Sequence, residues 1–399
     1  MKSENEKHFL HARERIPWAT QTNAKRQNPA WGAFMPPFIE RAKGCRMWDL
    51  DGREFIDYRC ALGPIILGYG FAEVDEAVRE QMQRGVLFSM ASPLELETAE
   101  AIIRNVPWLE QVRFMKTGAD ACTACVRLAR AYTGREHILT AGYHGYHDTF
   151  ALNWPTPGVP EVLREYVHDF QYNDLEAIDA AFEQFGSQLA AVIVEPYDWG
   201  LEIGNAFLQK LRQKCDEYGT VLIFDEVLTG FRLALGGAQA YFGVTPDLAA
   251  FAKAMANGYP VSAFAGKKQF MQQLEKTIIT TTYAGETLSL AACRKTMDIL
   301  SQQPVHEHIF KMGDMLKAGF ADILTECGLP ARAAGVPAAP FIHFDSADEQ
   351  KNLDLHNRLF AKLFENGIFA NERWFINFSH QPLDIEQTLE ALRRACRML

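Results

Sequence analysis

Several features that define other classes of protein are missing from this chain of 399 residues. No apolar run is long enough to span a bilayer, and the polar opening MKSENEKHFLHARERIP lacks the apolar segment of a signal peptide. Acidic residues outnumber basic ones, and the formal net charge of -10 argues against nucleic acid or an anionic membrane as the main partner. We therefore expect a cytoplasmic protein without a nucleic-acid or membrane partner.

The cysteine pattern does not match the common structural zinc sites. The chain has 8 cysteines, and only Cys122 and Cys125 form a close pair, with no second CxxC to complete a site. Because this pair falls within a helical pattern, we expect reduced thiols that pack in a helix. A G-x-G-x-x-G turn is also missing, which argues against a nicotinamide enzyme.

Two short apolar runs end in residues that carry chemistry. Val221–Phe224 ends in Asp225 and Glu226, and Leu248–Ala252 ends in Lys253. Runs of this kind are typical of buried parallel strands, and ligand sites collect beyond the carboxyl ends of such strands. A buried lysine can attack a carbonyl and a buried carboxylate needs a cationic partner, so pyridoxal phosphate meets both demands. In the alternative interpretation, the two acids cap a helix and the lysine is a surface charge.

The order of strands and helices predicts an α/β protein with a mostly parallel central sheet. Residues 1–60 are expected to form an N-terminal arm and a small meander with a hairpin turn at Asp51-Gly52, residues 61–290 a large domain, and residues 291–399 a small α+β domain. Strands are predicted at Val112–Met115, His137–Ala141, Leu189–Val194, Val221–Phe224, Leu248–Ala252, Ser262–Ala265, Phe341–Phe344, Ile368–Ala370 and Ile376–Phe378. Helices are predicted at Glu4–Arg15, Phe71–Gln83, Pro93–Arg104, Phe207–Tyr218, Leu288–Leu300, His306–Cys327, Asn352–Asn366 and Ile385–Met398.

A glycine turn follows the strand Val112–Met115. Gly118 and Ala119 open a helix that runs to Tyr132, which leaves backbone N–H groups and the positive end of the helix dipole at one spot. This arrangement suits a phosphate group, although an ordinary turn with Asp120 in the first helical turn explains the same pattern equally well.

The segment Gly142–Asp148 reads GYHGYHD, and its two histidines and aspartate could suggest a metal site. No further cluster of Cys, His or carboxylate residues supports such a site, so we expect no metal. An aromatic ring stacked on a flat cofactor fits this segment better.

Six longer motifs resemble those of a known family. They read WDLDGREFIDY, RLARAYTGREHI, GYHGYHD, VIVEP, IFDEVLTGFR and AKAMANGYPVSAFAG. From about Pro37 to the C-terminus, the chain resembles class III pyridoxal-phosphate-dependent aminotransferases, within them the glutamate-1-semialdehyde 2,1-aminomutase-like branch. The resemblance implies fold type I, pyridoxal 5'-phosphate as cofactor, small-molecule amine and carbonyl substrates, and a homodimer with active sites at its interface.

The resemblance also assigns roles to individual residues. Lys253 matches the Schiff-base lysine, and Asp225 matches the acid that pairs with the pyridine nitrogen. Val227 and Tyr143 match the residues on the two faces of the cofactor ring, with His144 beside the tyrosine, and Gly118 and Ala119 match the turn that binds the phosphate. Glu195 matches the acid at a strand end beside the substrate. Thr287 resembles a threonine that reaches the phosphate of the neighbouring subunit's cofactor.

Two departures from the family pattern concern cofactor binding. Ala119 stands where the family usually has serine or threonine, so backbone groups must carry more of the phosphate binding. The family's Gly-Asn-Pro is replaced by Leu290–Ala292, and Glu286 looks like an insertion beside Thr287.

A third departure concerns the substrate. The arm Asn28–Phe34 lacks the arginine that the aminomutase branch uses for the substrate carboxylate, and the loop Leu152–Pro160 is short where that branch has a gating loop. An intramolecular mutase must hold its intermediate behind a lid. We therefore predict an aminotransferase that moves an amino group between an amine or amino-acid donor and a carbonyl acceptor by a ping-pong aldimine/ketimine mechanism.

Several alternatives stay open. One is a true glutamate-1-semialdehyde 2,1-aminomutase, and another is a protein of this fold that has lost catalysis and acts as a binding module. Racemases and decarboxylases with the same cofactor are also possible. Four residues are candidates to shape the substrate pocket, and each could equally be a packing or surface residue: Trp31, Arg59, Tyr197 and Arg373.

Overall fold

The computed structural model describes residues 2–32, 34–152, 156–197 and 204–399. Ala33 of the arm and residues 153–155 of the short loop lie outside the described residues. The chain divides into two compact units, Ala72–His306 and a unit that joins Met1–Phe71 to Glu307–Leu399. These boundaries differ from the expected divisions after residues 60 and 290.

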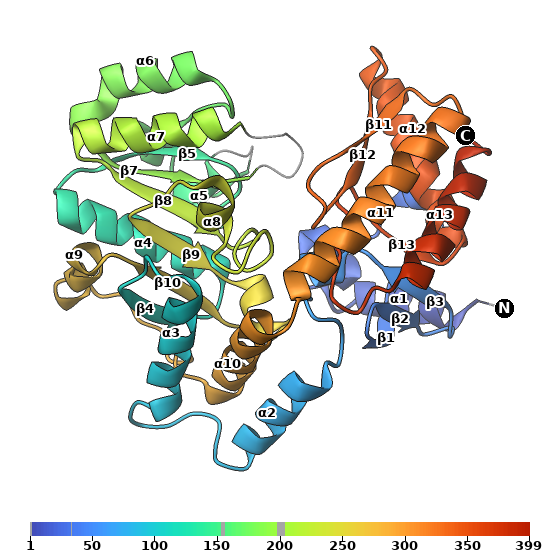
Figure 1. The fold of residues 1–399 in the computed structure, drawn as a ribbon, viewed down its shortest axis with the longest axis horizontal. Helices are drawn as coiled ribbons and strands as arrows, with labels where there is room; N and C mark the ends of the chain where they lie inside the picture. Colours follow the sequence, from blue (N-terminus) through green and yellow to red (C-terminus); the bar gives the residue numbers. More distant parts are fainter. Residues whose placement is uncertain (1, 33, 153–155, 198–203) are drawn as a thin grey trace. The chain divides into compact units, whose positions relative to one another are not determined.

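The unit Ala72–His306 is built on a seven-stranded sheet (Figure 1). Neighbouring strands from β9 to β6 are parallel, and β10 is antiparallel to both of its neighbours. The mostly parallel sheet predicted from the sequence is therefore confirmed. In spatial order the strands are β4 (Gln111–Met115), β10 (Ser262–Gly266), β9 (Leu248–Phe251), β8 (Val221–Glu226), β7 (Leu189–Val194), β5 (His137–Ala141) and β6 (Val167–Asp169).

Alternate residues of the central strands face two helical layers. Ile223 belongs to a core cluster with α4 (Gly118–Thr133), whereas Leu222 and Phe224 belong to a cluster with α6 (Leu175–Phe185) and α7 (Asn205–Tyr218). Because helices cover both faces, the strands are apolar throughout, as parallel strands usually are. Side chains alternate along a strand, so Asp225 lies on the α4 face of the sheet.

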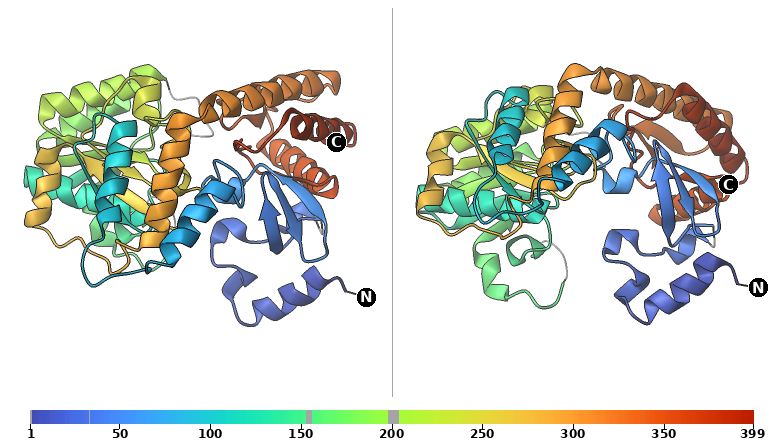
Figure 2. Two further views of the ribbon diagram at one scale, coloured as in Figure 1. Left: turned by 60° about the horizontal axis from the view of Figure 1, so that its bottom comes forward. Right: turned by 90° about the horizontal axis from the view of Figure 1, so that it is seen from below.

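In this unit a further helix, α10 (Thr287–Gln302), packs against two others, α2 (Ala72–Met82) and α3 (Pro93–Asn105). The three helices lie side by side in both views of Figure 2. Shorter helices are α5 (Asp148–Ala151), α8 (Ala238–Phe242) and α9 (Lys268–Met271). Within the described part of the chain, every helix is too short or too polar to cross a membrane.

The other unit joins the two ends of the chain. The expected meander is formed by β1 (Ile39–Lys43), β2 (Arg46–Asp49) and β3 (Glu54–Asp57), and β13 (Ile368–Phe369) pairs with β3 in parallel. This pairing explains why residues before 72 and after 306 form one unit. The unit also contains α1 (Glu4–Arg13), nearly all of α11 (Val305–Glu326), β11 (Ala331–Ala334), β12 (Phe341–Phe344), α12 (Glu349–Glu365) and α13 (Pro382–Cys396).

The strand predicted at Ile376–Phe378 is wrong. The N–H of Ile376 donates to the carbonyl of Ala338 at 3.1 Å, and the N–H of Phe378 donates to the carbonyl of Ile66 at 2.8 Å. Since these acceptors lie on different segments, the chain here is apolar and hydrogen-bonded but forms no ladder with a single partner strand.

Candidate active site

The carboxyl ends of five strands meet at one edge of the large sheet. Strands β5, β7, β8 and β9 run parallel, and β4 shares their direction because β10 is antiparallel to both β4 and β9. This edge is where open α/β sheets bind ligands. The predicted residues gathered there are Gly118 and Ala119 after β4, Tyr143 and His144 after β5, Glu195 after β7, Asp225 and Val227 at the end of β8, and Lys253 after β9.

Asp225 is 2% exposed and is held by a neighbour in its own segment and by a histidine from the segment after β5. Its Oδ1 accepts the backbone N–H of Val227 at 3.0 Å, and its Oδ2 lies 2.8 Å from Nδ1 of the buried His144. An ionised carboxylate only accepts, so His144 donates from Nδ1, and its buried Nε2 has no partner among the described residues. A carboxylate has about four acceptor positions, which leaves Asp225 room for a further donor such as a ring N–H.

Cys122 of α4 completes a buried group with His144 and Asp225, and one potential ligand atom of each lies within 4.8 Å of the others. Burial and the neighbouring Asp225 raise the pKa of the Cys122 thiol well above its ordinary value, so the thiol is neutral. Because His144 and Asp225 are already joined by a hydrogen bond, we interpret the group as a support for Asp225. The expectation of no metal stays a prediction.

The CxxC pair packs in the core. Cys122 and Cys125 are both 0% exposed, and they belong to the cluster between α4 and the sheet. All 8 cysteines lie among the described residues, and none of them is in a disulfide.

Lys253 lies just beyond β9, beside the end of β8. In the register of these strands, Glu226 pairs with Phe251, and Lys253 follows two residues later. The φ of Lys253 is 47°, a left-handed conformation that costs about 1–3 kcal/mol in a residue other than glycine. Strain of this kind persists only where the surroundings impose it and clusters at functional sites. Here β9 holds one side of the lysine and the helical turn Lys253–Ala256 holds the other.

Glu226 has a different role from its neighbour Asp225. Its carboxylate accepts the N–H groups of Ala238 at 2.9 Å and Gln239 at 3.2 Å, at the start of α8. Burial raises the pKa of Glu226 to about 7, although these donors and the Thr229 hydroxyl oppose the shift. The interpretation of these acids as helix caps therefore holds for Glu226 and not for Asp225.

The turn after β4 is closed by a reciprocal cap. The Oγ1 of Thr117 accepts the N–H of Asp120 at 3.2 Å, and the Asp120 carboxylate accepts the N–H of Thr117 at 2.9 Å. The backbone N–H groups of Gly118 and Ala119 have no acceptor in the described part of the chain. Two free donors at the positive end of a helix favour an anion.

The same turn is packed closely on both sides. A Cβ at Gly118 would lie 2.8 Å from both γ-carbons of Val227, so only glycine fits at this position. A Cβ at Gly145 would lie 2.4 Å from the Cβ of Ala119. The turn therefore lies between the segments that follow β8 and β5.

Tyr143 and Glu195 lie at the rim of this arrangement. Tyr143 is 56% exposed, so its ring is accessible to a flat ligand. The N–H of Glu195 donates to the carbonyl of Ala141 at 3.2 Å, and the hydroxyl of Tyr172 donates to the same carbonyl at 2.9 Å. These bonds fix the ends of β5 and β7 to each other.

Comparison with known proteins identifies the family. Residues 28–374 match the family described as Aminotransferase class-III. The chain is a class III aminotransferase.

The aminotransferase has curated relatives of two names. It is 34% identical to 3-aminobutyryl-CoA aminotransferase from Cloacimonas acidaminovorans (strain Evry), over 97% of this chain and 95% of that one. It is 35% identical to glutamate-1-semialdehyde 2,1-aminomutase from Desulforamulus reducens, over 91% of this chain and 90% of that one. Among solved structures, the FumI protein of Sphingopyxis sp. MTA144 in its PLP internal aldimine form has a TM-score of 0.92 at 30% identity and covers 99% of this chain and 96% of its own.

The aminotransferase depends on pyridoxal phosphate, as the family and its structural neighbours show. The geometry fits this cofactor, because Asp225 has an acceptor position left for a ring N–H and the turn at Gly118 offers free donors for a phosphate. Lys253 supplies the amine at the adjacent strand end.

The hydroxyl of Thr287 has partners within its own chain, and its role at a neighbouring subunit's phosphate stays a prediction. Thr287 is 0% exposed, and its hydroxyl donates to the carbonyls of Gly85 at 2.8 Å and Val86 at 3.0 Å. A threonine hydroxyl has one proton to donate, and in this conformation the two carbonyls receive it. The hydroxyl instead attaches the start of α10 to the loop after α2.

Two of the four substrate candidates are packing residues in the structure. Trp31 is 8% exposed, donates from Nε1 to Asn357 at 2.9 Å, and its ring lies 5.6 Å from that of Phe364. Tyr197 is 4% exposed, and its ring stacks at 6.4 Å on that of Phe242. Their roles as substrate residues stay predictions.

The two arginine candidates lie in the unit that joins the chain ends. Arg59 is 9% exposed, its N–H donates to Asp57 at 2.8 Å, and its guanidinium donates to the carbonyl of Ala24. Arg373 is half-buried beside the buried Trp374. Both assignments stay predictions.

Lys116 lies beside the site, directly before the turn at Gly118, and the sequence analysis did not predict a role for it. Its ammonium lies 3.0 Å from the carboxylate of Glu286, the apparent insertion, in an ion pair that spans 170 positions. The position of Glu286 just before the predicted helix could have indicated that it caps the start of α10. The partner could not be found from the sequence, because the pairing depends on the sheet topology.

Proposed function

We propose that Lys253 and Asp225 are the catalytic residues and that the substrates are a separate amine donor and carbonyl acceptor. The observation that carries the proposal is the buried carboxylate of Asp225, hydrogen-bonded to His144 at 2.8 Å and to Val227 at 3.0 Å, one strand away from Lys253. These two contacts leave the carboxylate of Asp225 an acceptor position for the N–H of a protonated ring nitrogen.

The residues divide the work of proton transfer. When bound, pyridoxal phosphate supplies an electron-withdrawing ring that makes the substrate C–H bond acidic. Asp225 would accept a hydrogen bond from the protonated ring nitrogen, and Nζ of Lys253 would act as the base that takes the proton from the substrate carbon and then as the acid that returns it. Tyr143 and Val227 confine the two faces of the ring. The free N–H groups of Gly118 and Ala119 hold the phosphate.

Two sequence features favour two substrates over an intramolecular mutase. The described residues of the arm Asn28–Phe34 include no arginine, and only nine residues span Leu152–Pro160 in the sequence. A short segment offers little material for a lid that would retain an intermediate. Relatives of both names are about equally similar to the chain, so identity alone does not decide between them.

The visible absorption spectrum tests the proposal. With pyridoxal phosphate, the wild-type protein should show a yellow band that Lys253→Ala abolishes. We expect the band to bleach with an amine donor and to return with a keto acid, in a panel that includes 3-aminobutyryl-CoA and glutamate 1-semialdehyde. Fast conversion of the semialdehyde alone would support the mutase instead, and a wild-type protein without a lysine-dependent band would disprove the site.

We also propose that the active form is a homodimer in the cytoplasm. The loop between α2 and α3 exposes large apolar side chains, with Phe88 46% and Met90 83% exposed, and Leu96 of α3 is 65% exposed. Such a concentration in one segment is typical of a protein interface. The free cysteines support a reducing compartment.

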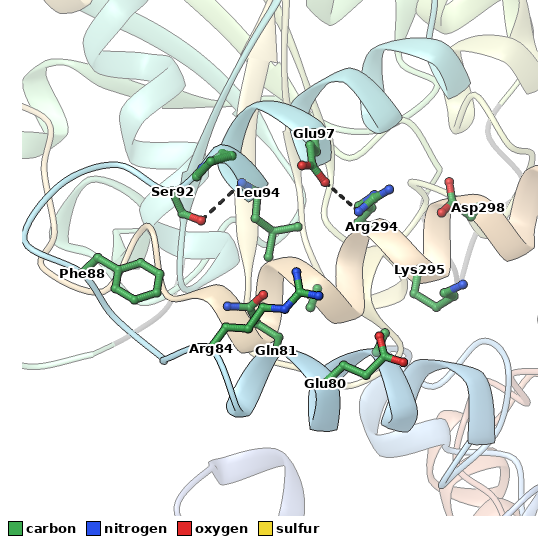
Figure 3. Close-up of a pocket in the computed structure, with 13 residues that line it drawn as sticks. Glu80, Gln81, Arg84, Phe88, Ser92, Leu94, Glu97, Arg294, Lys295 and Asp298 are labelled. Carbon is green, nitrogen blue, oxygen red and sulfur yellow. Dashed lines mark hydrogen bonds and ion pairs between the residues drawn. The ribbon is translucent and has the colours of Figure 1, made fainter.

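A hollow beside this loop supports the same interface. A cavity of about 460 Å³ lies between α2, α3 and α10, and Figure 3 shows Phe88 and Leu94 at its wall. Its rim carries both signs of charge, for example Arg84 and Glu80, which suits a surface that meets a second copy of itself about a two-fold axis. Sedimentation of the wild type and of Met90→Glu tests the proposal, and we expect a dimer that the substitution weakens. A monomeric wild type would contradict it.

A further inference from the structure

Two departures of this chain from the family pattern meet in space. Ala119 lacks a hydroxyl for the phosphate, and Glu286 looks inserted, yet Glu286 is tied to Lys116, which immediately precedes the turn Thr117–Ala119. We propose that Lys116 and Glu286 are positioning residues that fix this turn, so that its backbone N–H groups are already in place for the phosphate of the cofactor. The inference rests on the proposed role of the turn.

Glu286 is rigidly placed at the start of α10. Its carboxylate accepts the N–H of Leu288 at 2.7 Å, the N–H of Ser289 at 3.2 Å and the hydroxyl of Ser289 at 2.6 Å. Burial opposes its ionisation, but the Ser289 hydroxyl and the Lys116 ammonium hold the pKa of Glu286 below its ordinary value. A capped helix therefore presents a fixed negative charge to Lys116.

Lys116 connects this charge to the edge of the sheet. Its ammonium lies 3.0 Å from the Glu286 carboxylate and donates to the carbonyl of Pro260 at 3.0 Å. The side chains of Lys116 and Glu286 are 20% and 14% exposed, so water screens the pair less than it screens a surface ion pair. The ammonium of Lys116 is thereby held by two segments, the start of α10 and the residue Pro260 that precedes β10.

The turn itself is fixed by other contacts as well. The hydroxyl of Ser262 donates to the carbonyl of Thr117 at 2.7 Å, and Asp120 closes the cap on the opposite side. These contacts leave the N–H groups of Gly118 and Ala119 free for a ligand. Donors that are fixed before binding lose less entropy on binding, so rigidity can replace the missing hydroxyl.

The test compares two ligands that differ only in the phosphate. Full-length protein freed of cofactor is titrated with pyridoxal phosphate and with pyridoxal, and binding is followed by fluorescence and by the visible band. The variants are Lys116→Met, Glu286→Gln, the double variant and Lys116→Arg. Glu286→Gln keeps an oxygen for the cap of α10, which protects the fold. The control is Lys214→Met, because Lys214 is 15% exposed and forms a 3.0 Å ion pair with Asp179 in the α6 and α7 layer.

We expect Lys116→Met and Glu286→Gln each to weaken binding of pyridoxal phosphate about tenfold, the scale of one such hydrogen-bonded pair. Binding of pyridoxal should change less than about twofold, the double variant should be no worse than either single one, and Lys116→Arg should recover most of the loss. The control should match the wild type for both ligands.

Three results would overturn the inference. Unchanged or tighter binding of pyridoxal phosphate in both variants would show that the pair does not serve the turn. Equal losses for both ligands would show a general structural role, and additive losses would show that the two residues do not act together. If the wild type has no visible band that depends on Lys253, the proposed function is wrong and the inference falls with it. If the wild type has this band and the variants bind pyridoxal phosphate with wild-type affinity, only the inference is wrong.

Discussion

One added methyl group at Gly118 tests the packing of the site directly. A Cβ there would lie 2.8 Å from both γ-carbons of Val227, so Val227 would have to move. Overpacking of this kind costs about 1–3 kcal/mol. Val227 also donates its N–H to Asp225 at 3.0 Å, and losing that bond adds about 1 kcal/mol. We therefore expect Gly118→Ala to lower the free energy of unfolding by about 2–4 kcal/mol.

The assay is chemical unfolding of the wild type, Gly118→Ala, Val227→Ala and the double variant. Val227→Ala removes both clashing carbons, so the double variant should be more stable than the sum of the single effects by about 1 kcal/mol or more. Gly204→Ala is the control, since a Cβ there would meet only the Oδ1 of Asn173 at 3.8 Å and should cost under about 1 kcal/mol. Additive effects, or a Gly118→Ala variant as stable as the control, would refute the packing argument.

Further predictions concern buried acids and the support of Asp225. Burial raises the pKa of Glu226 from 4.5 to about 7, so the folded state binds this proton more tightly than the unfolded state does. The protonated carboxyl group therefore stabilises the fold fully below pH 4.5, and this contribution is lost as the pH rises through 7. Glu226→Gln should therefore flatten the pH dependence of unfolding in that window, and an unchanged slope would contradict the assignment. Burial likewise raises the pKa of Asp57 from 3.8 to about 6, so Asp57→Asn should flatten the lower window from pH 3.8 to 6 in the same titration. His144→Phe removes the donor 2.8 Å from Asp225 and should weaken pyridoxal phosphate and pyridoxal alike, by about tenfold, in contrast to the Lys116 variants. A His144→Phe protein with unchanged affinity for both ligands would show that Asp225 does not need this support.

Strand ends were predictable because their signal is local. The apolar runs before Asp225 and Lys253 identify β8 and β9 without reference to any other part of the chain. The rule that parallel strands share a carboxyl edge then places both residues at one site. The family resemblance added names for the roles, and the fold and cofactor that it implied are confirmed by the comparisons.

Contacts between distant segments were not predictable. Thr287 resembles a phosphate ligand in sequence, but Gly85 and Val86, about 200 positions away, accept its hydroxyl proton. Trp31 likewise finds Asn357 across 326 positions. The hydrogen-bond partners of polar side chains are brought near only by the folded topology. A local sequence pattern therefore cannot distinguish a residue that binds the cofactor from one that makes a structural hydrogen bond.

The failed strand at Ile376–Phe378 has the same cause. Its apolar composition fits a strand, and composition reports burial correctly, since Ile376 is 0% exposed. A strand also needs a neighbour of matching direction and length, and this segment borders several short pieces of chain instead. Burial was therefore predictable here, and pairing was not.

The antiparallel strand β10 affects how much the loop around Lys253 can move. The chain leaves the sheet after Phe251 at the end of β9 and re-enters it at Ser262 at the start of β10. The loop that contains Lys253 therefore has each end in a strand that is paired on both sides. The part of this loop next to Lys253 is also buried, at Ala254, Met255 and Ala256, so we expect its amide protons to exchange with solvent more slowly than those of an exposed loop. We therefore expect Lys253 to keep its position and its φ of 47° when the cofactor leaves, so that the empty site can bind a new cofactor without refolding.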